Sequence, residues 1–473
     1  MRAALAHAEP AWSPLSHVSL EPEVPAGERR SPAEVAAAIQ RRGAASHGSG
    51  WQAAWSGLER ERELTVPQAG ARLAGAFLAY LAVVVLLVTL VPFDFAVPDQ
   101  FQLYTGAQLG DALANILMFV PLGFLFQLAQ PASADRRALR ALLLGALLSL
   151  SVESAQLFLA ERFSSPVDVI TNALGAWLGA QLELGVARRL AVTPALVGRL
   201  ALELPLMGLV YLLVPLLWLA GLAAAASPQA GRAALLLPAG LVGAVILGQV
   251  WRHQLGPGGA LSRRRLAGVA AGWFGLGAFT ALGHSPWLVL GGAAFSGALA
   301  WLVAGRHLPP GPERRYEGPT LRAAAPLLAL FLLALTLWHA TEAPYPRGGI
   351  RWGSPFTSAG TAEILEFLEL CAAYTVAGYL IAEWRGRAER TPREAMVTAT
   401  AVALGSAVAL ELLVLAVGGP GGSLLRALAA AGAAAFGAWV YRLQLGFVRA
   451  LVRRQERERL DPEVPRAPLV ARW

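Results

Sequence analysis

The sequence contains no lysine, so all of its 39 basic side chains other than histidine are arginines. A Walker-type phosphate loop ends in a lysine, and Schiff-base catalysis also needs one. The lack of lysine therefore excludes both chemistries. Cysteine is nearly absent as well: Cys371 is the only one and lies in an apolar run. This excludes intrachain disulfides, thiol redox pairs and cysteine-rich zinc sites.

Charge is also scarce. Charged residues make up 15% of the 473 residues, against roughly 25% in ordinary soluble domains. Hydrophobic residues make up 56%, and the mean hydropathy is +0.51. Aqueous cores cannot absorb this apolar surplus, so the composition indicates an all-α, polytopic transmembrane protein. The net charge of +8 does not indicate a nucleic-acid partner, because the arginines form short clusters between apolar stretches and not one basic face.

Twelve apolar stretches have close to the roughly 20 residues that cross a bilayer core. The first begins near residue 72, too far from the start for a cleaved signal peptide, so we expect it to remain as a membrane anchor. The expected spans are 73–93, 111–129, 139–160, 167–187, 200–222, 233–251, 266–283, 286–305, 322–341, 361–382, 395–417 and 424–446.

Arginine clusters occupy every second connection between these spans. The intervening connections hold at most Arg162, Arg232, or the pair Arg347 and Arg351. By the positive-inside rule, both termini are therefore cytoplasmic and the arginine-poor loops face outward. Residues 1–70 lack apolar periodicity and predict a disordered cytoplasmic tail containing one short helix from Ser31. Residues 451–473 predict a second cytoplasmic tail.

Polar side chains inside apolar spans are costly and therefore informative. Most of them cluster in the first four spans. Asn115 lies near the outer start of span two, Glu153 and Gln156 lie three residues apart in span three, and Asp168 and Asn172 lie one turn apart in span four. At 1.5 Å per residue, Glu153 is roughly 10 Å below the outer end of its helix. All five side chains therefore share the outer third of the membrane.

Arg162, in the outer loop between spans three and four, is the expected counter-ion for the carboxylates. Gly175 and Gly179 form a small-xxx-small surface, which should let spans three and four pack so that the polar groups converge. The same side chains could instead be interhelical hydrogen bonds that only fix packing. Glu153 would be neutral in apolar surroundings and ionised beside Arg162, and the sequence leaves both states open. We interpret Asp111 as complementing a helix dipole.

Three segments and Arg162 together resemble the VanZ-like family, membrane proteins named after a teicoplanin-resistance factor. The segments are Asn-x-x-x-Phe-x-Pro-x-Gly from Asn115 to Gly123, Ser-x-x-x-Glu-x-x-Gln ending at Gln156, and Asp-x-x-x-Asn-x-x-Gly from Asp168 to Gly175. The resemblance covers about a quarter of the chain. It implies a four-helix membrane domain, placed at 71–190, in the cell envelope. It implies no established activity, so no catalytic role is transferred.

The last third of the chain resembles a degenerate second copy of that domain. We therefore divide the remaining membrane region into a linking four-span part, 191–320, and a second VanZ-like unit, 321–450. The copy keeps packing positions and loses most polar ones. The matched positions are Gly378 with Gly123, Glu411 with Glu153, Gly432 with Gly175, Leu370 with Asn115 and Val414 with Gln156.

Other polar residues in this last third carry weaker predictions. Glu363, Glu366 and Glu369 follow one another at helical spacing and could line a cavity, although an interfacial helix start explains the first two equally well. His339 has no spaced partner, so an interfacial position is a better interpretation than a metal ligand.

These features predict a protein of the bacterial inner membrane with an outward-facing polar cavity. The cavity would handle the head group of a lipid-linked cell-wall precursor or a glycopeptide and contribute to antibiotic or envelope-stress tolerance. Arg162 would hold an anionic group, Glu153 and Asp168 would accept protons or hydrogen bonds and are the candidate catalytic residues, and Asn115, Gln156 and Asn172 would orient them. Gly123, Gly175 and Gly179 would serve helix packing.

Three functional classes stay open at this point. A hydrolase or transferase would need one carboxylate poised near neutral pH. A proton-coupled transporter or lipid flippase would use the same carboxylates for coupling, and a non-catalytic scaffold would not need them. The sequence shows no nucleophile and no metal-ligand set, and we expect no cofactor. Membrane lipids are the expected surroundings and partners.

Overall fold

The computed structural model describes most of the chain from Thr65 to Leu460. The expected disordered tail lies outside the described residues except for its last few positions, as do the short helix from Ser31 and residues 461–473. The described residues are 65–98, 101, 103–104, 106, 108–130, 137–159, 162–189, 205–227, 229–255, 262–305, 317–342, 360–386, 392–417 and 423–460.

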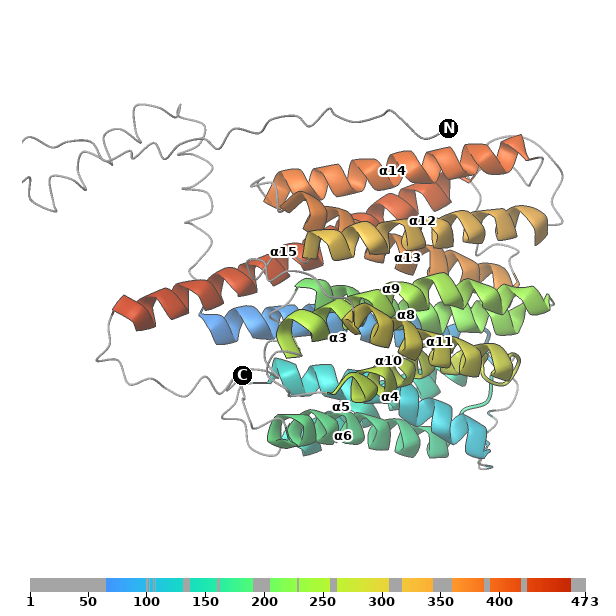
Figure 1. Ribbon diagram of the computed structural model, residues 1–473. Coiled ribbons are helices and arrows are strands. Elements are labelled where there is room, and N and C mark those ends of the chain that lie inside the picture. The colour runs from blue at the N-terminus through green and yellow to red at the C-terminus, as the bar shows by residue number, and fades with distance from the viewer. Residues whose placement is uncertain are drawn as a thin grey trace, which may run out of the picture. The chain divides into compact units, whose positions relative to one another are not determined.

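Four helices make up the first part: α3 (Val66–Leu90), α4 (Leu109–Ala129), α5 (Arg137–Gln156) and α6 (Pro166–Arg189), all visible in Figure 1. Helix α3 begins earlier than expected, within the segment assigned to the tail. The backbone N–H of Thr65 donates to Gln68 Oε1 at 3.1 Å, and a proline stands in the first turn. Both features favour a helix start there.

Eight helices follow. Helix α9 is preceded by the 3₁₀ turn η2 (Ala230–Leu235) and followed by the π-helical turn η3 (Trp251–Leu255), and α10 runs into the 3₁₀ turn η4 (Phe279–Ala281). The eight are α8 (Pro205–Ala226), α9 (Leu236–Val250), α10 (Arg263–Ala278), α11 (Pro286–Gly305), α12 (Glu317–Glu342), α13 (Thr361–Gly386), α14 (Pro392–Ala416) and α15 (Leu424–Leu460).

The predicted fold class is confirmed. Each of the twelve expected spans corresponds to one α-helix, and the described residues contain no β-strand beyond two isolated bridges. Ten helical segments of the described chain are long and apolar enough to cross a membrane. The two helices outside that set are α6, which carries several polar side chains, and α10, which has 16 residues. The chain is a multi-pass membrane protein.

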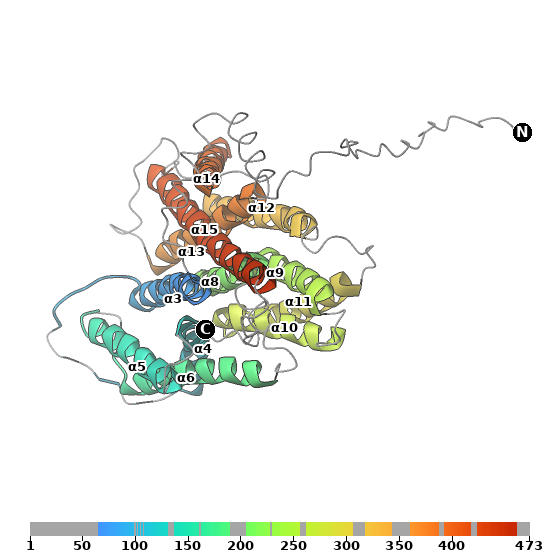
Figure 2. The same cartoon turned by 90° about the vertical axis from the view of Figure 1, so that its left-hand side faces the viewer.

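The core lies in α8, α9 and α13. In the apolar stretch of α13, 83% of the residues are buried, against 22% in α14 and 28% in α5. Both views place α5 and α6 at one edge of the bundle and α14 at the other, with α3, α8 and α13 between them (Figures 1 and 2). The edge helices expose large apolar side chains such as Leu147 and Leu412, as expected for surfaces that face lipid.

Helices α4 and α6 approach closely through glycines. A Cβ on Gly123 would overlap the Ala176 carbonyl oxygen, and one on Gly179 would overlap that of Val120. Gly175 similarly lies against Ile116. The sequence predicted that Gly175 and Gly179 would bring span four against span three, but they face α4. Packing of α5 on α6 uses a different contact, Gly145 against Ala176.

Helix α15 continues to Leu460, past the expected boundary of the second unit at residue 450. Its predicted tail therefore begins as helix. The reason lies in the sequence after the apolar part: no proline occurs until Pro462, and the last glycine is Gly446. With no helix-breaking residue in between, the arginine-rich segment extends the same helix.

Candidate functional site

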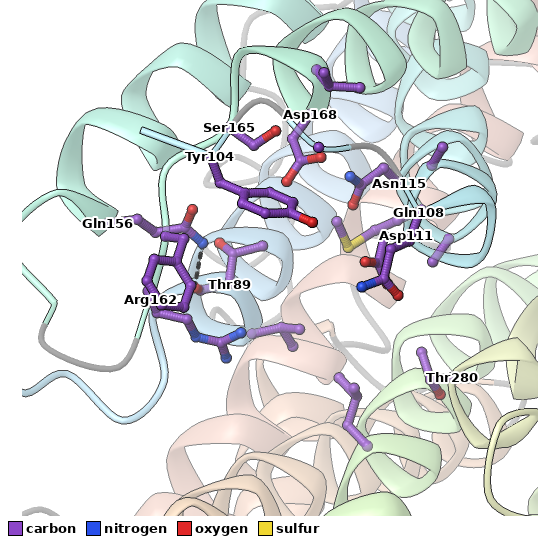
Figure 3. A pocket seen from close by; sticks show the side chains of 18 of the residues that line it. Thr89, Tyr104, Gln108, Asp111, Asn115, Gln156, Arg162, Ser165, Asp168 and Thr280 are labelled. Atoms are coloured by element: carbon purple, nitrogen blue, oxygen red, sulfur yellow. Dashed lines mark hydrogen bonds between the residues drawn. The ribbon is translucent and has the colours of Figure 1, made fainter. Parts of the chain in front are cut away.

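A cavity of about 710 Å³ lies at one end of α3–α6 (Figure 3). Its walls come from the end of α3, the segment before α4 and its first turns, the end of α5 and the start of α6, together with Leu222 of α8 and Phe279 and Thr280 of η4. Among its lining residues are Thr89, Tyr104, Gln108, Asp111, Asn115, Met118, Gln156, Arg162, Ser165 and Asp168.

Two backbone carbonyls at the end of α3, those of Thr89 and Val91, accept hydrogen bonds from side chains of the cavity wall. The Gln156 Nε2 group donates to the Thr89 carbonyl at 3.0 Å. The Arg162 Nε and Nη2 groups donate to the Val91 carbonyl at 3.3 and 3.1 Å. Phe93, in the same turn, has a φ of 64°, which is uncommon for a bulky side chain. The turn after α3 and the segment after α5 are therefore held together by side chains predicted for ligand binding.

The expected pairing of Arg162 with the predicted carboxylates is not observed: within the described part of the chain, its guanidinium forms no ion pair with Glu153 or Asp168. The Val91 carbonyl takes its place. Because a carbonyl carries no net charge, Arg162 keeps its positive charge at the cavity wall with no ion-pair partner among the described residues. In Figure 3, Arg162 and Gln156 lie across the cavity from Asn115 and Asp111.

Glu153 is buried, with 5% of its surface exposed, and does not itself line the cavity. Its Oε2 atom accepts the backbone N–H of Ser165 at 2.6 Å, and Ser165 forms part of the cavity wall. Glu153 thus fixes the connection between α5 and α6 from the side away from the cavity. Asp168, half-buried in the first turn of α6, does line the cavity. Its neighbours include the Asn115 amide and the Asp111 carboxylate.

Asn172 lies apart from this group. Its Nδ2 donates to Ser149 Oγ at 2.8 Å, so it joins α6 to α5 below the cavity and is not among the lining residues. Its Oδ1 atom is buried and has no hydrogen-bond partner within the described residues. Of the predicted ligand-binding residues, the cavity therefore collects Asn115, Gln156, Arg162 and Asp168, with Glu153 directly behind its wall.

Sequence reasoning missed several lining residues. Asp111 was assigned to the helix dipole, although its position one turn before Asn115 already indicated a shared face. Tyr104 and Gln108 precede α4 and carry no periodic pattern. Thr280 and Leu222 come from distant spans, and only packing brings them here: Thr280 Oγ1 donates to the Trp218 carbonyl at 3.0 Å, which fixes η4 against α8.

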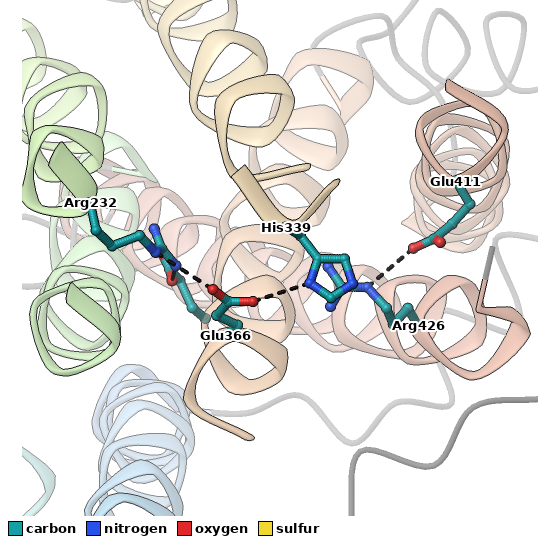
Figure 4. Close-up of polar contacts among 6 residues, drawn as sticks. Arg232, His339, Glu366, Glu411 and Arg426 are labelled. Atoms are coloured by element: carbon teal, nitrogen blue, oxygen red, sulfur yellow. Dashed lines mark hydrogen bonds and ion pairs between the residues drawn. The ribbon is translucent and has the colours of Figure 1, made fainter. Parts of the chain in front are cut away.

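A second group of buried charges lies in the later helices (Figure 4). Arg232, fully buried in η2, donates through Nη2 to Glu369 Oε2 of α13. Its Nε atom lies 3.7 Å from Glu366 Oε1. Glu366 Oε2 in turn lies 3.2 Å from His339 Nδ1 of α12. The outer-loop Arg232 predicted from the topology is therefore an internal counter-ion, and Glu366 and Glu369 are buried in the bundle.

A separate ion pair joins α14 to α15. Arg426 Nε donates to Glu411 Oε1 at 3.2 Å, and the Ser423 backbone N–H donates to Glu411 Oε2 at 2.9 Å. Both side chains are largely buried. Within the described residues, no group of three or more His, Cys, Asp or Glu side chains is arranged to hold a metal ion.

Fold and site together define a multi-pass helical membrane protein with a polar cavity at one end of its first four helices. A family model described as VanZ/LLP1 matches residues 72–186, which span α3–α6 almost completely. The resemblance stated from the motifs is therefore confirmed, and α3–α6 form a VanZ-like segment covering about a quarter of the chain. No curated protein and no solved structure matches the chain.

Proposed function

We propose that the protein binds a polar head group in the cavity of α3–α6, on the outer side of the bacterial inner membrane. The head group would belong to a lipid-linked cell-wall precursor or a glycopeptide, and binding would contribute to tolerance of antibiotics or envelope stress. The observation that carries this proposal is the mixed lining of the cavity. Carboxylates, amides and a guanidinium share it with apolar residues such as Met118, Leu222 and Phe279, a combination that suits a charged group attached to an apolar body.

The proposed sidedness of the cavity rests on the distribution of arginines between the helices. The cavity lies where α3, α5, α8 and α10 end and where α4 and α6 begin. These ends adjoin the arginine-poor connections, which the positive-inside rule assigns to the outer face. A head group in the outer leaflet or outside the cell would therefore reach the cavity without crossing the membrane.

The lining supports distinct roles for its residues. Arg162 keeps an uncompensated charge at the wall and would bind an anionic oxygen such as a phosphate. The amides of Asn115 and Gln108 and the Tyr104 hydroxyl would hydrogen-bond the neutral part of the head group. Asp168 remains the candidate proton acceptor, because it lines the cavity directly, whereas Glu153 lies behind Ser165.

The test is growth under cell-wall stress, scored together with the abundance of the protein in membranes. Asp168→Asn and Arg162→Gln change lining residues, whereas Ser154→Ala changes an exposed side chain of α5 whose Oγ bonds only its own helix. We expect the two lining variants to lose tolerance at normal abundance and the control to keep it. Normal tolerance of both lining variants at normal abundance would contradict the proposal.

Purified protein in vesicles would separate the alternatives of transporter, enzyme and scaffold. Uptake or lipid scrambling that Asp168→Asn abolishes would indicate a transporter or flippase. A chemically altered lipid would indicate an enzyme. If neither occurs and both lining variants keep the phenotype, a scaffold is the better description, and the cavity then serves the fold alone.

We also propose that α12–α15 are a second copy of α3–α6. The support is a set of recurring contacts, in which glycines of α13 and α15 approach one another's helices as those of α4 and α6 do. Gly432, matched to Gly175 by sequence, has open space around it and does not take part. The recurring contacts are Gly378 with Ala434 for Gly123 with Ala176, Gly437 with Thr375 for Gly179 with Val120, and Ser423 with Glu411 for Ser165 with Glu153.

A further inference from the structure

The same hydrogen bond recurs in both four-helix units. In each, a backbone N–H donates to the Oε2 atom of a glutamate twelve residues earlier: Ser165 to Glu153 at 2.6 Å and Ser423 to Glu411 at 2.9 Å. In each, the glutamate lies in the last two turns of one helix, and the serine immediately precedes the next helix. The bond therefore gives a common frame in which the neighbouring side chains of the two units can be compared.

In that frame one position changes the sign of its charge. Three residues after the serine, the first unit has Asp168 and the second has Arg426. In the second unit the Arg426 guanidinium occupies the space beside this glutamate, because its Nε donates to Glu411 Oε1 at 3.2 Å. In the first unit the Asp168 carboxyl instead stands next to that of Glu153. Among the described residues, neither of these two carboxylates has a cationic partner.

At a second pair of matched positions, the carboxylate of the later unit again has cations of this chain beside it and that of the first unit has none among the described residues. Glu366 in α13 and Asp111 in α4 each precede the packing glycine of their helix, Gly378 and Gly123, by the same number of residues. Glu366 has cations of this chain beside it, the His339 ring at 3.2 Å and the Arg232 guanidinium at 3.7 Å. Asp111 faces the cavity and, within the described part of the chain, forms no ion pair.

We infer that the cavity of α3–α6 takes a cationic group of its ligand, an ammonium or a guanidinium, beside Asp168 and Asp111, in the region that corresponds to Arg426 of the second unit. This inference rests on the proposed function and names the chemistry of its ligand. Carboxylates that share one cavity favour an opposite charge beside them, and Arg162 cannot supply it because its guanidinium is directed to the Val91 carbonyl.

The position of Arg162 adds a second requirement on the ligand. It lies across the cavity from Asn115 and Asp111 (Figure 3), so a cation on the acidic side leaves room for an anion on the arginine side. A zwitterionic group with a phosphate and an ammonium matches both sides. A purely anionic head group would match Arg162 and leave the carboxylates without a cation.

The experiment uses the full chain purified in detergent, with its melting temperature measured as ligand is added. The probes are short-chain phosphatidylethanolamine, its N-acetyl derivative, which lacks the positive charge, and short-chain phosphatidylglycerol. Free phosphoethanolamine is the soluble source of the same zwitterion. We expect phosphatidylethanolamine to raise the melting temperature and the N-acetyl lipid not to. A response to phosphoethanolamine as well would show that the apolar chains are dispensable.

The decisive variant is Asp168→Arg, which copies the second unit into the first. The introduced guanidinium should pair with Glu153, so the protein should fold normally and bind phosphatidylethanolamine at least about tenfold more weakly. Asp168→Asn removes the charge with little change in volume and serves the same purpose if the larger side chain lowers the yield of folded protein. Ser154→Ala is the matched control and should bind like the unaltered chain.

Two results would overturn the inference, and they differ in what else they affect. If phosphatidylglycerol or the N-acetyl lipid stabilises the protein as well as phosphatidylethanolamine does, and Arg162→Gln but not Asp168→Arg abolishes the effect, the cavity binds head groups by their anion alone. The proposed function would then stand without the cation. If none of the probes changes the melting temperature, the inference fails, and the head-group function is then decided separately by the growth test of Asp168→Asn and Arg162→Gln.

Discussion

The Ser165 backbone N–H has its acceptor inside the protein, on the Glu153 carboxylate. This bond fixes the connection between α5 and α6, which carries Arg162 and leads into Asp168. The Val91 carbonyl has a comparable part, because it accepts two N–H groups of Arg162. At the scale of single residues, the cavity is therefore built as much from backbone groups as from the polar side chains that attract attention in the sequence.

Substitutions of Glu153 separate its charge from its hydrogen bond. Glu153→Gln keeps an oxygen that can accept from Ser165, so we expect a nearly unchanged free energy of unfolding. Glu153→Leu leaves the buried N–H without an acceptor and should cost about 1–3 kcal/mol. Denaturant unfolding of the purified protein in detergent measures both. Equal stabilities of the two variants would show that the bond to Ser165 contributes little.

The Arg232 ion pair allows a similar separation in the later helices. Arg232→Ala would leave Glu369 as an uncompensated charge and should destabilise the protein by about 3–5 kcal/mol. The double substitution Arg232→Met with Glu369→Leu removes both charges and should restore most of that loss. Arg264→Ala, on an exposed side chain of α10, is the control, and a double-substitution cycle of melting temperatures measures the coupling. Additive effects of the two single changes would argue against a coupled pair.

At the residue scale, the sequence indicated which polar side chains would converge where such a side chain is rare in its surroundings. Asn115, Gln156 and Asp168 are polar groups in apolar spans, and all three line the cavity. It failed for the partner of Arg162, because a backbone carbonyl such as that of Val91 leaves no trace in the residue types.

At the scale of helices, the distance between two neighbours depends on where a glycine lies at their contact. In α15, Gly437 lies against the Thr375 carbonyl of α13, while Gly432 has open space around it. The two glycines are five positions apart on one helix, yet only one of them sets an interhelical distance. Close approach, and not glycine content alone, therefore determines which helices pair.

These two glycines give a matched test of the packing. Gly437→Ala should push α15 away from α13 and cost about 1–3 kcal/mol, as overpacking does. Gly432→Ala meets no neighbour and should be neutral or stabilising by up to about 1 kcal/mol, because alanine favours helix. Thermal unfolding in detergent of the two variants measures the difference. If Gly437→Ala is as stable as Gly432→Ala, the approach of α13 and α15 is looser than described.

The existence of the helices was predictable, and their partners were not. Each apolar stretch of about 20 residues gave one helix, because the bilayer requires that length. The glycine pattern identified Gly175 and Gly179 as packing residues but assigned them to span three, whereas they face α4. Glycine spacing indicates that a neighbouring helix can approach closely. Which helix does so depends on the packing of the whole bundle.

At the scale of the whole molecule, every second connection is rich in arginine, and the cavity lies at the opposite end of the bundle. The arginines described at that end do not contradict the rule. Arg232 is fully buried against carboxylates, and Arg162 is bound to a carbonyl. Arg232 is therefore not a free positive charge of the kind that the positive-inside rule counts, and Arg162 is a single arginine where the opposite connections carry clusters.

The sidedness can be tested with single cysteines in a Cys371→Ala background. We expect Tyr104→Cys, at an exposed position beside the cavity, to react with a membrane-impermeant maleimide in intact cells. Arg264→Cys, at the start of α10, should react only after the membrane is permeabilised. Labelling followed by gel shift measures both. The reverse pattern would place the cavity on the cytoplasmic side.

Helix α15 has 37 residues and is therefore roughly 55 Å long, against a hydrocarbon core of about 30 Å. Arg426, which pairs with Glu411, lies in its first turn. The helix therefore extends from the level of the Arg426–Glu411 ion pair to well past the opposite leaflet. If the helix moved as one body, a tilt of about 10° at the Arg426 end would displace the far tip by roughly 10 Å, so a small rearrangement of the charges around Arg426 would become a large displacement at the other end of the helix.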